Sequence, residues 1–465
     1  MADRKYRRRA AKAASPCKRR HPRYAIAPSR HLRILHITGS FPPWRTGGIA
    51  AHVDYLVRAL TDLHDTCGDR ACNVRVLTAG DESSDGKARV LTPILLCHPL
   101  KGKGGHFLPG GEIPLGDTVK QVLDLWPHLW RESQADIIHV HDFESAFIGM
   151  LLKSAFGVRL AMTVHKTPKE WNPTNVRSNV KDCYLETIRN FRLVDVMFAP
   201  SEAYRKRLDQ QHFGRRVRLV HHGVPIKRLR KTSEYPDVFR RLDLAEVARF
   251  VLMPCRLDRH KAPDVLINAA ALLGKRARSE GLIFVITGAG SCSTDDDSLN
   301  YRNQILALVK QLGVQDIVRV GPSDGQDVPA YEMPTLYRRA LACVVPSRRD
   351  GFPQAVLESF AFGLPTVAAL TGGIEDMIDP EENGLLFNRD EPEDLADKLL
   401  QLLDRPDFAG RLGKAGFHTV RRKFSADRMA RRHFSCYCEA VYGTRRRPKR
   451  KGTALTQRSL GMTRP

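Results

Sequence analysis

Short apolar runs alternate with segments of helical periodicity along most of this chain, and this alternation restricts the fold more than any other feature. In the first half, the apolar runs lie at residues 32–38, 73–79, 135–141, 160–165, 194–200 and 217–222. Their length and flanking turn residues are typical of buried strands. Strands that alternate with helices form parallel sheets, so the sequence predicts an α/β protein with a doubly wound sheet.

The same pattern starts again after residue 248. Strands are predicted at 250–254, 282–287, 317–320, 341–345 and 365–369, a hairpin-like or edge segment at 383–387, and helices at 263–273, 301–312 and 392–403. No strand follows the last predicted helix, 426–442. The chain therefore divides into two doubly wound halves with a boundary near 223–248. Ligands are expected where the carboxyl ends of the strands face the crevice between the halves.

One stretch of the second half combines groups that suit a charged sugar ligand. The strand 341–345 ends in Pro-Ser, and an apolar helix is predicted from Gln354 onwards. Glu358 lies within this helix and needs hydrogen-bond donors, while Asp350 lies in the loop before it. A helix start offers N–H groups to an anion, and carboxylates accept hydrogen bonds from hydroxyls. The alternative is that Glu358 pairs with an internal Arg and Asp350 is a solvated loop acid.

A second strand–loop–helix unit lies near the start of the chain. Gly47 and Gly48 separate the strand 32–38 from a segment with apolar residues at helical spacing. This arrangement also favours anion binding at a helix start, although glycine is common in an ordinary strand–helix turn as well.

The net charge of +24 is concentrated at the two ends of the chain. Residues 1–33 hold twelve Lys or Arg and one acid, and residues 444–465 hold eight Lys or Arg and no acid. We expect basic disordered tails at 1–31 and 443–465. Such tails could contact an anionic membrane surface, bind nucleic acid non-specifically, or be solvated extensions only.

Cysteine spacing and hydropathy indicate the compartment. The ten cysteines include no Cys-x-x-Cys pair, which favours buried thiols in a reducing environment. No apolar run approaches the length of a membrane span. We therefore expect a cytoplasmic protein, with peripheral contact at the inner membrane face as an option for the basic tails.

Several motifs occur in an order that carries a family resemblance. They are Gly47-Gly48, His139-Val140-His141, Thr163-Val164-His165, Ala199-Pro200-Ser201, His222-Gly223-Val224, Arg256-Leu257 with Lys261, Asp350 and Glu358 eight positions apart, Gly372-Gly373-Ile374 and Asn383-Gly384-Leu385-Leu386-Phe387. With these motifs, the chain from about residue 32 to 442 resembles the family 4 retaining glycosyltransferases of the GT-B fold.

The resemblance implies a domain plan. An N-terminal acceptor-side Rossmann-like domain at 32–223 would face a C-terminal nucleotide-sugar-binding Rossmann-like domain at 224–425 across a cleft. The helix 426–442 would cross back to the first domain.

The resemblance also implies roles for residues of the second domain. Arg256 and Lys261 would hold the donor diphosphate, as two cations past a strand end can, although either alone could be an exposed basic residue. Glu358 would bind the ribose hydroxyls, and Asp350 the hydroxyls of the transferred sugar. The family usually has Glu at the position of Asp350, so the carboxylate here is one methylene shorter.

Further donor contacts are implied around these residues. The backbone N–H groups of Gly351 and Phe352 would help Asp350 to bind the sugar. From the first domain, Gly48 would approach the diphosphate and His165 would contact the donor sugar. His165, Asp350 and Glu358 are thus the expected catalytic residues.

No metal or cofactor is expected. Asp295-Asp296-Asp297 is interpreted as a solvated loop. The resemblance implies that no divalent ion is needed, because cationic side chains and helix ends can neutralise the leaving group. His139 and His141, next to Asp142, could suggest a metal site, but we expect one to face the acceptor cleft and the other to pack.

The predicted activity is a retaining sugar transfer from a nucleotide-sugar to a hydroxyl of a glycan, a lipid-linked saccharide or a small molecule. The leaving phosphate would deprotonate the acceptor on the same face of the sugar. Two alternatives are a catalytically weakened GT-B protein that binds nucleotides or polyanions, and a nucleic-acid binder that uses its basic tails. Nucleic acid is not the expected partner.

Overall fold

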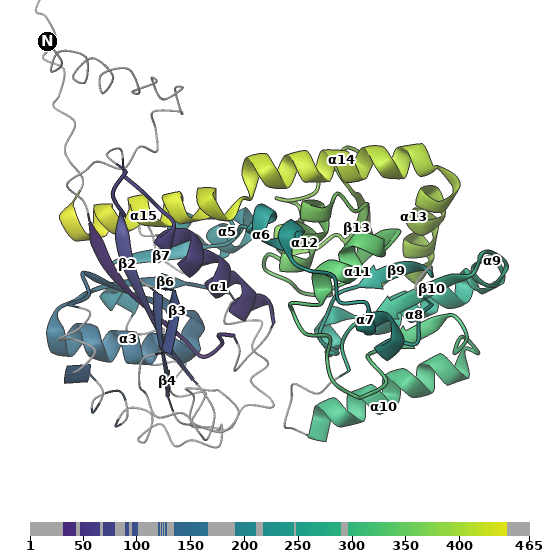
Figure 1. Ribbon diagram of the computed structural model, residues 1–465, viewed down its shortest axis with the longest axis horizontal. Helices are drawn as coiled ribbons and strands as arrows, with labels where there is room; N and C mark the ends of the chain where they lie inside the picture. The colour runs from purple at the N-terminus through teal and green to yellow at the C-terminus, as the bar shows by residue number, and fades with distance from the viewer. Residues whose placement is uncertain are drawn as a thin grey trace, which may run out of the picture.

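A computed structural model describes residues 31–42, 47–65, 68–79, 89–92, 95–100, 134–165, 191–210, 217–245, 248–289 and 296–443, and single positions between 120 and 127. These residues form two α/β halves that lie side by side (Figure 1). Most of both basic tails and Asp295 lie outside the described residues, so what was predicted for them stays a prediction. Asp296 and Asp297, predicted to lie in the same loop as Asp295, are instead the first residues of the helix Asp296–Gln311. Among the described helices, none combines the length and the apolar character that crossing a bilayer requires.

The N-terminal half is built on an eight-stranded sheet with the order β3-β4-β2-β1-β5-β6-β7-β8. Its strands are β1 (Leu32–Thr38), β2 (Cys72–Ala79), β3 (Arg89–Thr92), β4 (Leu95–Leu100), β5 (Ile137–His141), β6 (Arg159–Thr163), β7 (Val196–Ala199) and β8 (Val217–Leu219). Neighbours are parallel except for β3, which runs antiparallel to β4. Neither β3 nor β4 was predicted from the sequence. Pro99 within β4 cannot donate to a ladder, which weakens any strand signal in that segment.

The C-terminal half is built on a six-stranded parallel sheet with the order β11-β10-β9-β12-β13-β14. The strands are β9 (Arg249–Met253), β10 (Leu282–Ile286), β11 (Val318–Val320), β12 (Ala342–Val345), β13 (Thr366–Ala369) and β14 (Leu385–Phe387). The chain order reverses between β9 and β12, so the carboxyl ends of these two strands form the switch point where ligands bind in such sheets. The α/β fold class with two doubly wound sheets is confirmed, and 383–387 contributes a parallel edge strand.

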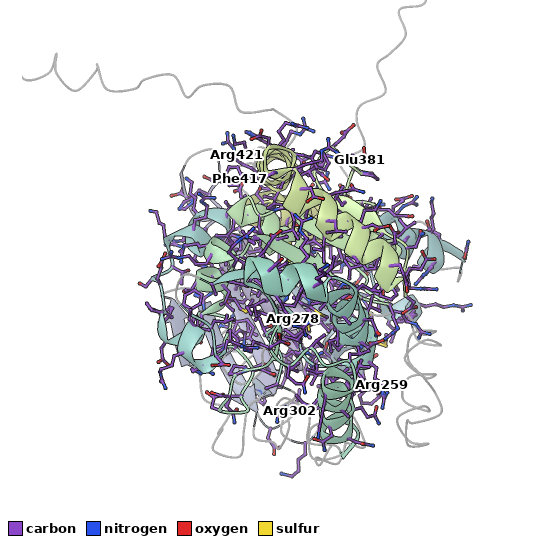
Figure 2. All side chains as sticks on the ribbon, turned by 90° about the vertical axis from the view of Figure 1, so that its right-hand side faces the viewer. Arg259, Arg278, Arg302, Glu381, Phe417 and Arg421 are labelled. Atoms are coloured by element: carbon purple, nitrogen blue, oxygen red, sulfur yellow. The ribbon has the colours of Figure 1, made fainter. Side chains whose placement is uncertain are left out.

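Helices cover both sheets. In the first half they are α1 (Gly48–Thr61), α3 (Asp142–Phe156) and α5 (Glu202–Gln210). After the first sheet follow α6 (Ile226–Lys231), α7 (Asp237–Arg241), α8 (Pro263–Leu272), α9 (Gly274–Glu280), α10 (Asp296–Gln311), α11 (Met333–Arg339), α12 (Gln354–Phe362), α13 (Pro392–Asp404), α14 (Pro406–Lys423) and α15 (Ala426–Tyr442). A short 3₁₀ turn, η3 (Phe191–Leu193), precedes β7 in the first half, and two others, η5 (Arg259–Lys261) and η6 (Gly372–Ile374), lie in the second half. Charged residues of the C-terminal half, such as Arg278 and Arg421, lie on its outside (Figure 2).

The chain passes twice between the halves at one place. Val224 donates its N–H to the carbonyl of Phe424, and Ala426 donates to the carbonyl of Val224, each at 3.0 Å. The two crossing segments are therefore tied to each other. After the second crossing, α15 lies along the N-terminal half, end to end with α14 over the C-terminal half (Figure 1). Its buried residues, among them Met429 and Phe434, join the core formed by α1 and β1.

Helix α14 was not predicted, because three glycines interrupt its helical pattern. Two of them allow close packing against the C-terminal half. A Cβ on Gly413 would lie 2.1 Å from the carbonyl oxygen of Gly363, and one on Gly416 would lie 2.7 Å from the ring of Phe360. Gly410 is exposed, with nothing within 4 Å of an added Cβ. Glycine is therefore a packing requirement at two of the three positions.

Paired substitutions in α14 test this packing. Gly413→Ala should destabilise the protein by about 1–3 kcal/mol, because the helix must move away from Gly363. Gly410→Ala should instead stabilise it by about 0.5–1 kcal/mol through higher helix propensity. Thermal unfolding of both variants measures the difference, and equal melting temperatures would contradict the packing argument.

Candidate active site

A cavity of about 560 Å³ lies between the two halves. The C-terminal half contributes residues that follow β9 and β12 and the beginning of α12, and the N-terminal half contributes the beginning of α1. The loop after β6 adds His165, whose side chain is buried. The cavity thus lies at the switch point where the sheet topology places a ligand. All eight residues predicted for the donor site line it: Gly48, His165, Arg256, Lys261, Asp350, Gly351, Phe352 and Glu358.

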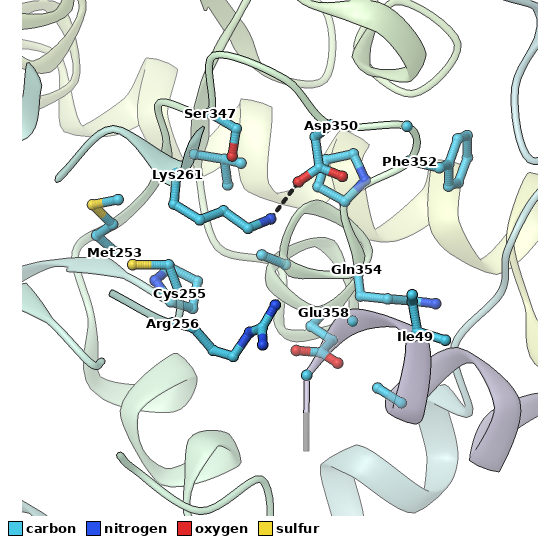
Figure 3. A pocket seen from close by; sticks show the side chains of 18 of the residues that line it. Ile49, Met253, Cys255, Arg256, Lys261, Ser347, Asp350, Phe352, Gln354 and Glu358 are labelled. Carbon is cyan, nitrogen blue, oxygen red and sulfur yellow. Dashed lines mark hydrogen bonds and ion pairs between the residues drawn. The ribbon is translucent and has the colours of Figure 1, made fainter. Parts of the chain in front are cut away.

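Two cations extend into this cavity from the segment after β9. Lys261 Nζ lies 2.5 Å from Asp350 Oδ2, with the two side chains 24% and 14% exposed. Arg256 lies against Gly47 of the other half, where its Nε would be 3.5 Å from an added Cβ. Its guanidinium forms no ion pair within the described part of the chain. Figure 3 shows both cations directed toward the side of the cavity that carries Asp350 and Glu358.

The loop that carries Asp350 rests on the glycines after β13. Gly372 has φ +49°, and a Cβ there would lie 2.7 Å from the carbonyl oxygen of Asp350. A Cβ on Gly373 would lie 1.9 Å from the carbonyl oxygen of Gly351. Any larger residue would push the loop into the cavity, so this Gly-Gly pair sets the position of Asp350.

Glu358 receives a hydrogen bond on each carboxylate oxygen. Tyr55 of α1 donates to Oε1 at 2.8 Å, and Tyr337 of α11 donates to Oε2 at 3.0 Å. Burial raises the pKa of Glu358, and the two tyrosine hydrogen bonds act in the opposite direction. The alternative of an internal Arg partner is wrong. Because each oxygen has two lone pairs, the carboxylate can still accept hydrogen bonds from a ligand.

Two helix starts meet at the cavity. Neither α1 nor α12 has a side-chain cap, and the first residue of each, Gly48 and Gln354, lines the cavity. Gln354 is 6% exposed, and its amide oxygen and nitrogen have no hydrogen-bond partner in the described part of the chain. No role in the site was predicted from the sequence for Gln354, Tyr55 or Tyr337. A polar residue at the first position of an apolar helix was the available signal for Gln354.

A group of buried histidines adjoins the N-terminal wall of the cavity. Seven imidazoles from several strands, helices and loops are each at most 8% exposed: His36, His52, His139, His141, His165, His222 and His433. His36 Nδ1 lies 3.0 Å from His141 Nε2, and His141 Nδ1 lies 3.4 Å from His165 Nε2. The first sheet brings them together, because β1 and β5 pair with His36 opposite His139.

His139 and His141 are both buried and do not line the cavity. His139 contacts Thr163 Oγ1 at 2.8 Å and the hydroxyl of Tyr437 at 2.6 Å. The expectation that one of the two faces a cleft is therefore wrong. His139 and His141 are two positions apart in β5 and therefore point to the same face of the sheet, which places their ring centroids 4.3 Å apart.

Burial lowers the pKa of most of these rings. It lowers the pKa of His36 to about 3 and that of His433 to about 4, and it holds the pKa values of His52, His139, His141 and His222 well below the usual range. Repulsion between neighbouring imidazolium ions adds to the effect of burial for most of them. These six rings are therefore uncharged at neutral pH.

The cavity, its cations and its two acids define the class of protein, and comparisons with known proteins agree. Residues 46–228 match the model of Glycosyltransferase Family 4, and residues 235–419 match that of Glycosyl transferases group 1. A D-inositol 3-phosphate glycosyltransferase of Salinispora arenicola is 31% identical over 66% of this chain and 69% of its own length. One of Streptomyces bingchenggensis is 29% identical over 92% of this chain and 91% of its own.

Solved structures confirm the fold. Sucrose-phosphate synthase from Thermosynechococcus elongatus matches with a TM-score of 0.70 at 21% identity, covering 89% of this chain and 100% of that one. Anabaena HepE in complex with UDP and glucose matches with a TM-score of 0.66 at 17% identity, covering 87% and 99%. The chain belongs to the family 4, or group 1, glycosyltransferases. It is a transferase of the GT-B fold that uses a nucleotide-sugar donor.

The histidine cluster makes stability sensitive to acid. Unfolded histidines titrate near pKa 6.5, whereas the buried ones bind protons only at much lower pH. The unfolded state therefore binds more protons below pH 6.5, and the free energy of unfolding falls as the pH is lowered. For His433 alone, with a folded pKa of about 4, the loss between pH 7 and pH 5 is about 2 kcal/mol.

His433→Phe should therefore lose about 2 kcal/mol less than the wild type between pH 7 and pH 5. Urea unfolding at several pH values measures this difference. His418→Gln, at an exposed position of α14, is the matched control and should follow the wild type. An unchanged pH dependence in His433→Phe would show that this histidine is not buried as a neutral ring.

Proposed function

We propose that this enzyme transfers the sugar with retention of the anomeric configuration and without a divalent metal ion. The observation that carries the proposal is the placement of two cations and two uncapped helix starts around a cavity that also holds Asp350 and Glu358. Cations and helix starts can stabilise the negative charge that grows on a diphosphate leaving group. The acids can bind the hydroxyls of the sugars.

In the proposed donor complex, Arg256 and Lys261 hold the diphosphate, and the backbone at Gly48 approaches it from the other half. Glu358, held in place by its two tyrosines, accepts hydrogen bonds from the ribose hydroxyls. Donor binding would replace the contact between Lys261 and Asp350, so that the cation meets the phosphates and the carboxylate meets the transferred sugar. Because Asp350 is shorter than the usual glutamate, the sugar would lie closer to the backbone of this loop.

The backbone N–H groups of Gly351 and Phe352 would bind the same sugar as Asp350. His165 would contact it from the N-terminal half, where its ring is held beside His141.

The proposed chemistry is a front-face substitution. The bond between the anomeric carbon and the phosphate oxygen breaks, and the acceptor oxygen bonds to the same face of that carbon. The acceptor proton passes to the departing phosphate oxygen. The roles proposed for the acids support this course over a covalent intermediate. Glu358, held by two tyrosines, would bind the ribose, and Asp350 would bind hydroxyls of the transferred sugar rather than its anomeric carbon.

The acceptor is proposed to be a small phosphorylated polyol of the inositol phosphate class. The support is that relatives at 29–31% identity are named D-inositol 3-phosphate glycosyltransferases. A cytoplasmic location, with the basic tails in contact with an anionic membrane, remains a separate proposal that rests on their charge.

Nucleotide binding tests the donor site. Thermal unfolding is measured with UDP, GDP and ADP, with and without EDTA. A nucleotide at 100 times its Kd should stabilise the wild type by about 2.7 kcal/mol, whether or not EDTA is present. The double variant Arg256→Ala/Lys261→Ala should lose this shift, whereas Lys275→Ala, an exposed cation of α9, should keep it. Stabilisation that needs a metal ion would contradict metal independence.

The stereochemical course is read directly from the product. With the donor that binds and inositol phosphate as acceptor, proton NMR of the first product should show the anomeric configuration of the donor sugar. Asp350→Asn should lower kcat/KM by about 100-fold, because it removes the charge that binds the sugar hydroxyls. Asp397→Asn, at an exposed position of α13, should leave it unchanged. An inverted product or a trapped glycosyl-enzyme would overturn the mechanism.

A further inference from the structure

The histidine cluster contains a set of side chains with the geometry of a metal site. His52 of α1, His141 at the end of β5 and His165 after β6 each offer one ring nitrogen, and the three nitrogens lie within 4.8 Å of one another. All three residues are buried. We infer that His52, His141 and His165 bind a Zn²⁺ ion.

The spacing of two of these nitrogens already fits a tetrahedral ion. Zinc binds imidazole nitrogen at about 2.0–2.1 Å, which places two ligands of one tetrahedral ion about 3.3–3.4 Å apart. His141 Nδ1 and His165 Nε2 are 3.4 Å apart. The ring centroid of His52 lies 4.9 Å from that of His165 and 5.7 Å from that of His141. The His52 nitrogen lies within 4.8 Å of both, so its ring must move closer to the other two to complete a tetrahedral set.

His52 and His222 are the rings of the cluster with both nitrogens unpartnered in the described part of the chain, and His52 is the more deeply buried of the two. It is 0% exposed, yet neither of its ring nitrogens has a hydrogen-bond partner in the described part of the chain. Buried polar groups are normally paired, because an unpaired one loses its hydration without compensation. A bound ion would satisfy one of its two nitrogens.

The surroundings of His141 provide the support that metal ligands usually have. Its second nitrogen, Nε2, lies 3.0 Å from His36 Nδ1, which fixes the ring and leaves Nδ1 directed at His165. Ligating histidines commonly use their other nitrogen in this way. A second group, formed by His36, His139 and His141, also meets the distance criterion. It is the poorer candidate, because both nitrogens of His139 already contact Thr163 and Tyr437.

The donor set selects the kind of ion. Three neutral imidazoles without a carboxylate suit Zn²⁺ and related transition ions, whereas Mg²⁺ and Mn²⁺ prefer oxygen ligands. Three protein ligands leave a fourth position for an exchangeable group. The site adjoins the cavity, because His165 lines it and the ring of His222, which also lines it, lies 3.9 Å from that of His52.

Occupation by zinc has a consequence that rests on the proposed role of His165. Zinc bound at Nε2 of His165 would hold the ring toward His52 and His141, so that the ring could no longer turn to contact the donor sugar. Zn²⁺ should therefore act as an inhibitor that competes with the donor, while EDTA leaves the transfer reaction intact.

Direct binding is the test. The full-length, tag-free protein is freed of metal and titrated with Zn²⁺ in the presence of a competing chelator, and with Co²⁺ while the visible spectrum is followed. One tightly bound equivalent is expected, with the strong ligand-field bands of tetrahedral Co²⁺ and no thiolate charge-transfer band. Failure of the wild type to bind, or a spectrum with thiolate bands, would overturn the site.

Variants assign the ligands. His52→Gln should weaken Zn²⁺ binding at least tenfold, and it replaces no residue that lines the cavity. His433→Gln, a matched control within the same cluster, should bind like the wild type. Retained stabilisation by the nucleotide that binds the wild type shows that each variant is folded. Zinc binding that survives His52→Gln would overturn this ligand set.

Inhibition kinetics distinguish the zinc site itself from its proposed effect on donor binding. Inhibition by Zn²⁺ that is competitive with the donor in the wild type, and absent in His52→Gln, supports both the site and its effect. Zinc binding without inhibition supports the site and contradicts the role proposed for His165.

Discussion

The relative position of the two halves depends on the pair of chain crossings at Val224 and Ser425. The two segments are hydrogen-bonded to each other, and a Cβ on Gly223 would lie 2.6 Å from the carbonyl oxygen of Ser425. The second crossing leads directly into α15, whose apolar face joins the core of the N-terminal half. Because the C-terminal half is thereby anchored on both sides of one hinge, its sheet edge faces α1 and the cavity forms between them.

The cavity brings together charged side chains that would each be costly to bury alone and that stabilise one another when they lie side by side. Lys261 and Asp350 neutralise each other at 2.5 Å, and the half-buried Glu358 accepts a hydrogen bond from a tyrosine of each half. The contact between Tyr55 and Glu358 couples closure of the halves to the position of the acid proposed to bind the ribose. Exclusion of water on closure would strengthen each electrostatic contact with the diphosphate proposed to bind here.

The first sheet carries histidines at buried positions of β1 and β5. A neutral imidazole can pack in a core, but it retains an N–H and a lone pair that need partners. The hydrogen-bonded series from His36 through His141 to His165 ends at the cavity wall, whereas both ring nitrogens of His52 and of His222 lack a partner in the described part of the chain. His52 stands outside this series, which is why the metal site proposed for it differs from simple core packing.

The sequence alone determined the alternation of strands and helices in most of both halves, the switch-point loops and eight of the residues that line the cavity, because apolar periodicity and turn residues are local signals and the family motifs are contiguous. It missed β3 and β4, and it missed α14, where two of the three glycines are explained only by packing on Gly363 and Phe360. Only the tertiary structure decided the partners. The contact of Tyr55 with Glu358 joins residues 303 positions apart, and the ion pair of Lys261 with Asp350 joins residues 89 apart. No local pattern encodes such pairings, since they arise when parallel strands bring distant loops to one edge of a sheet.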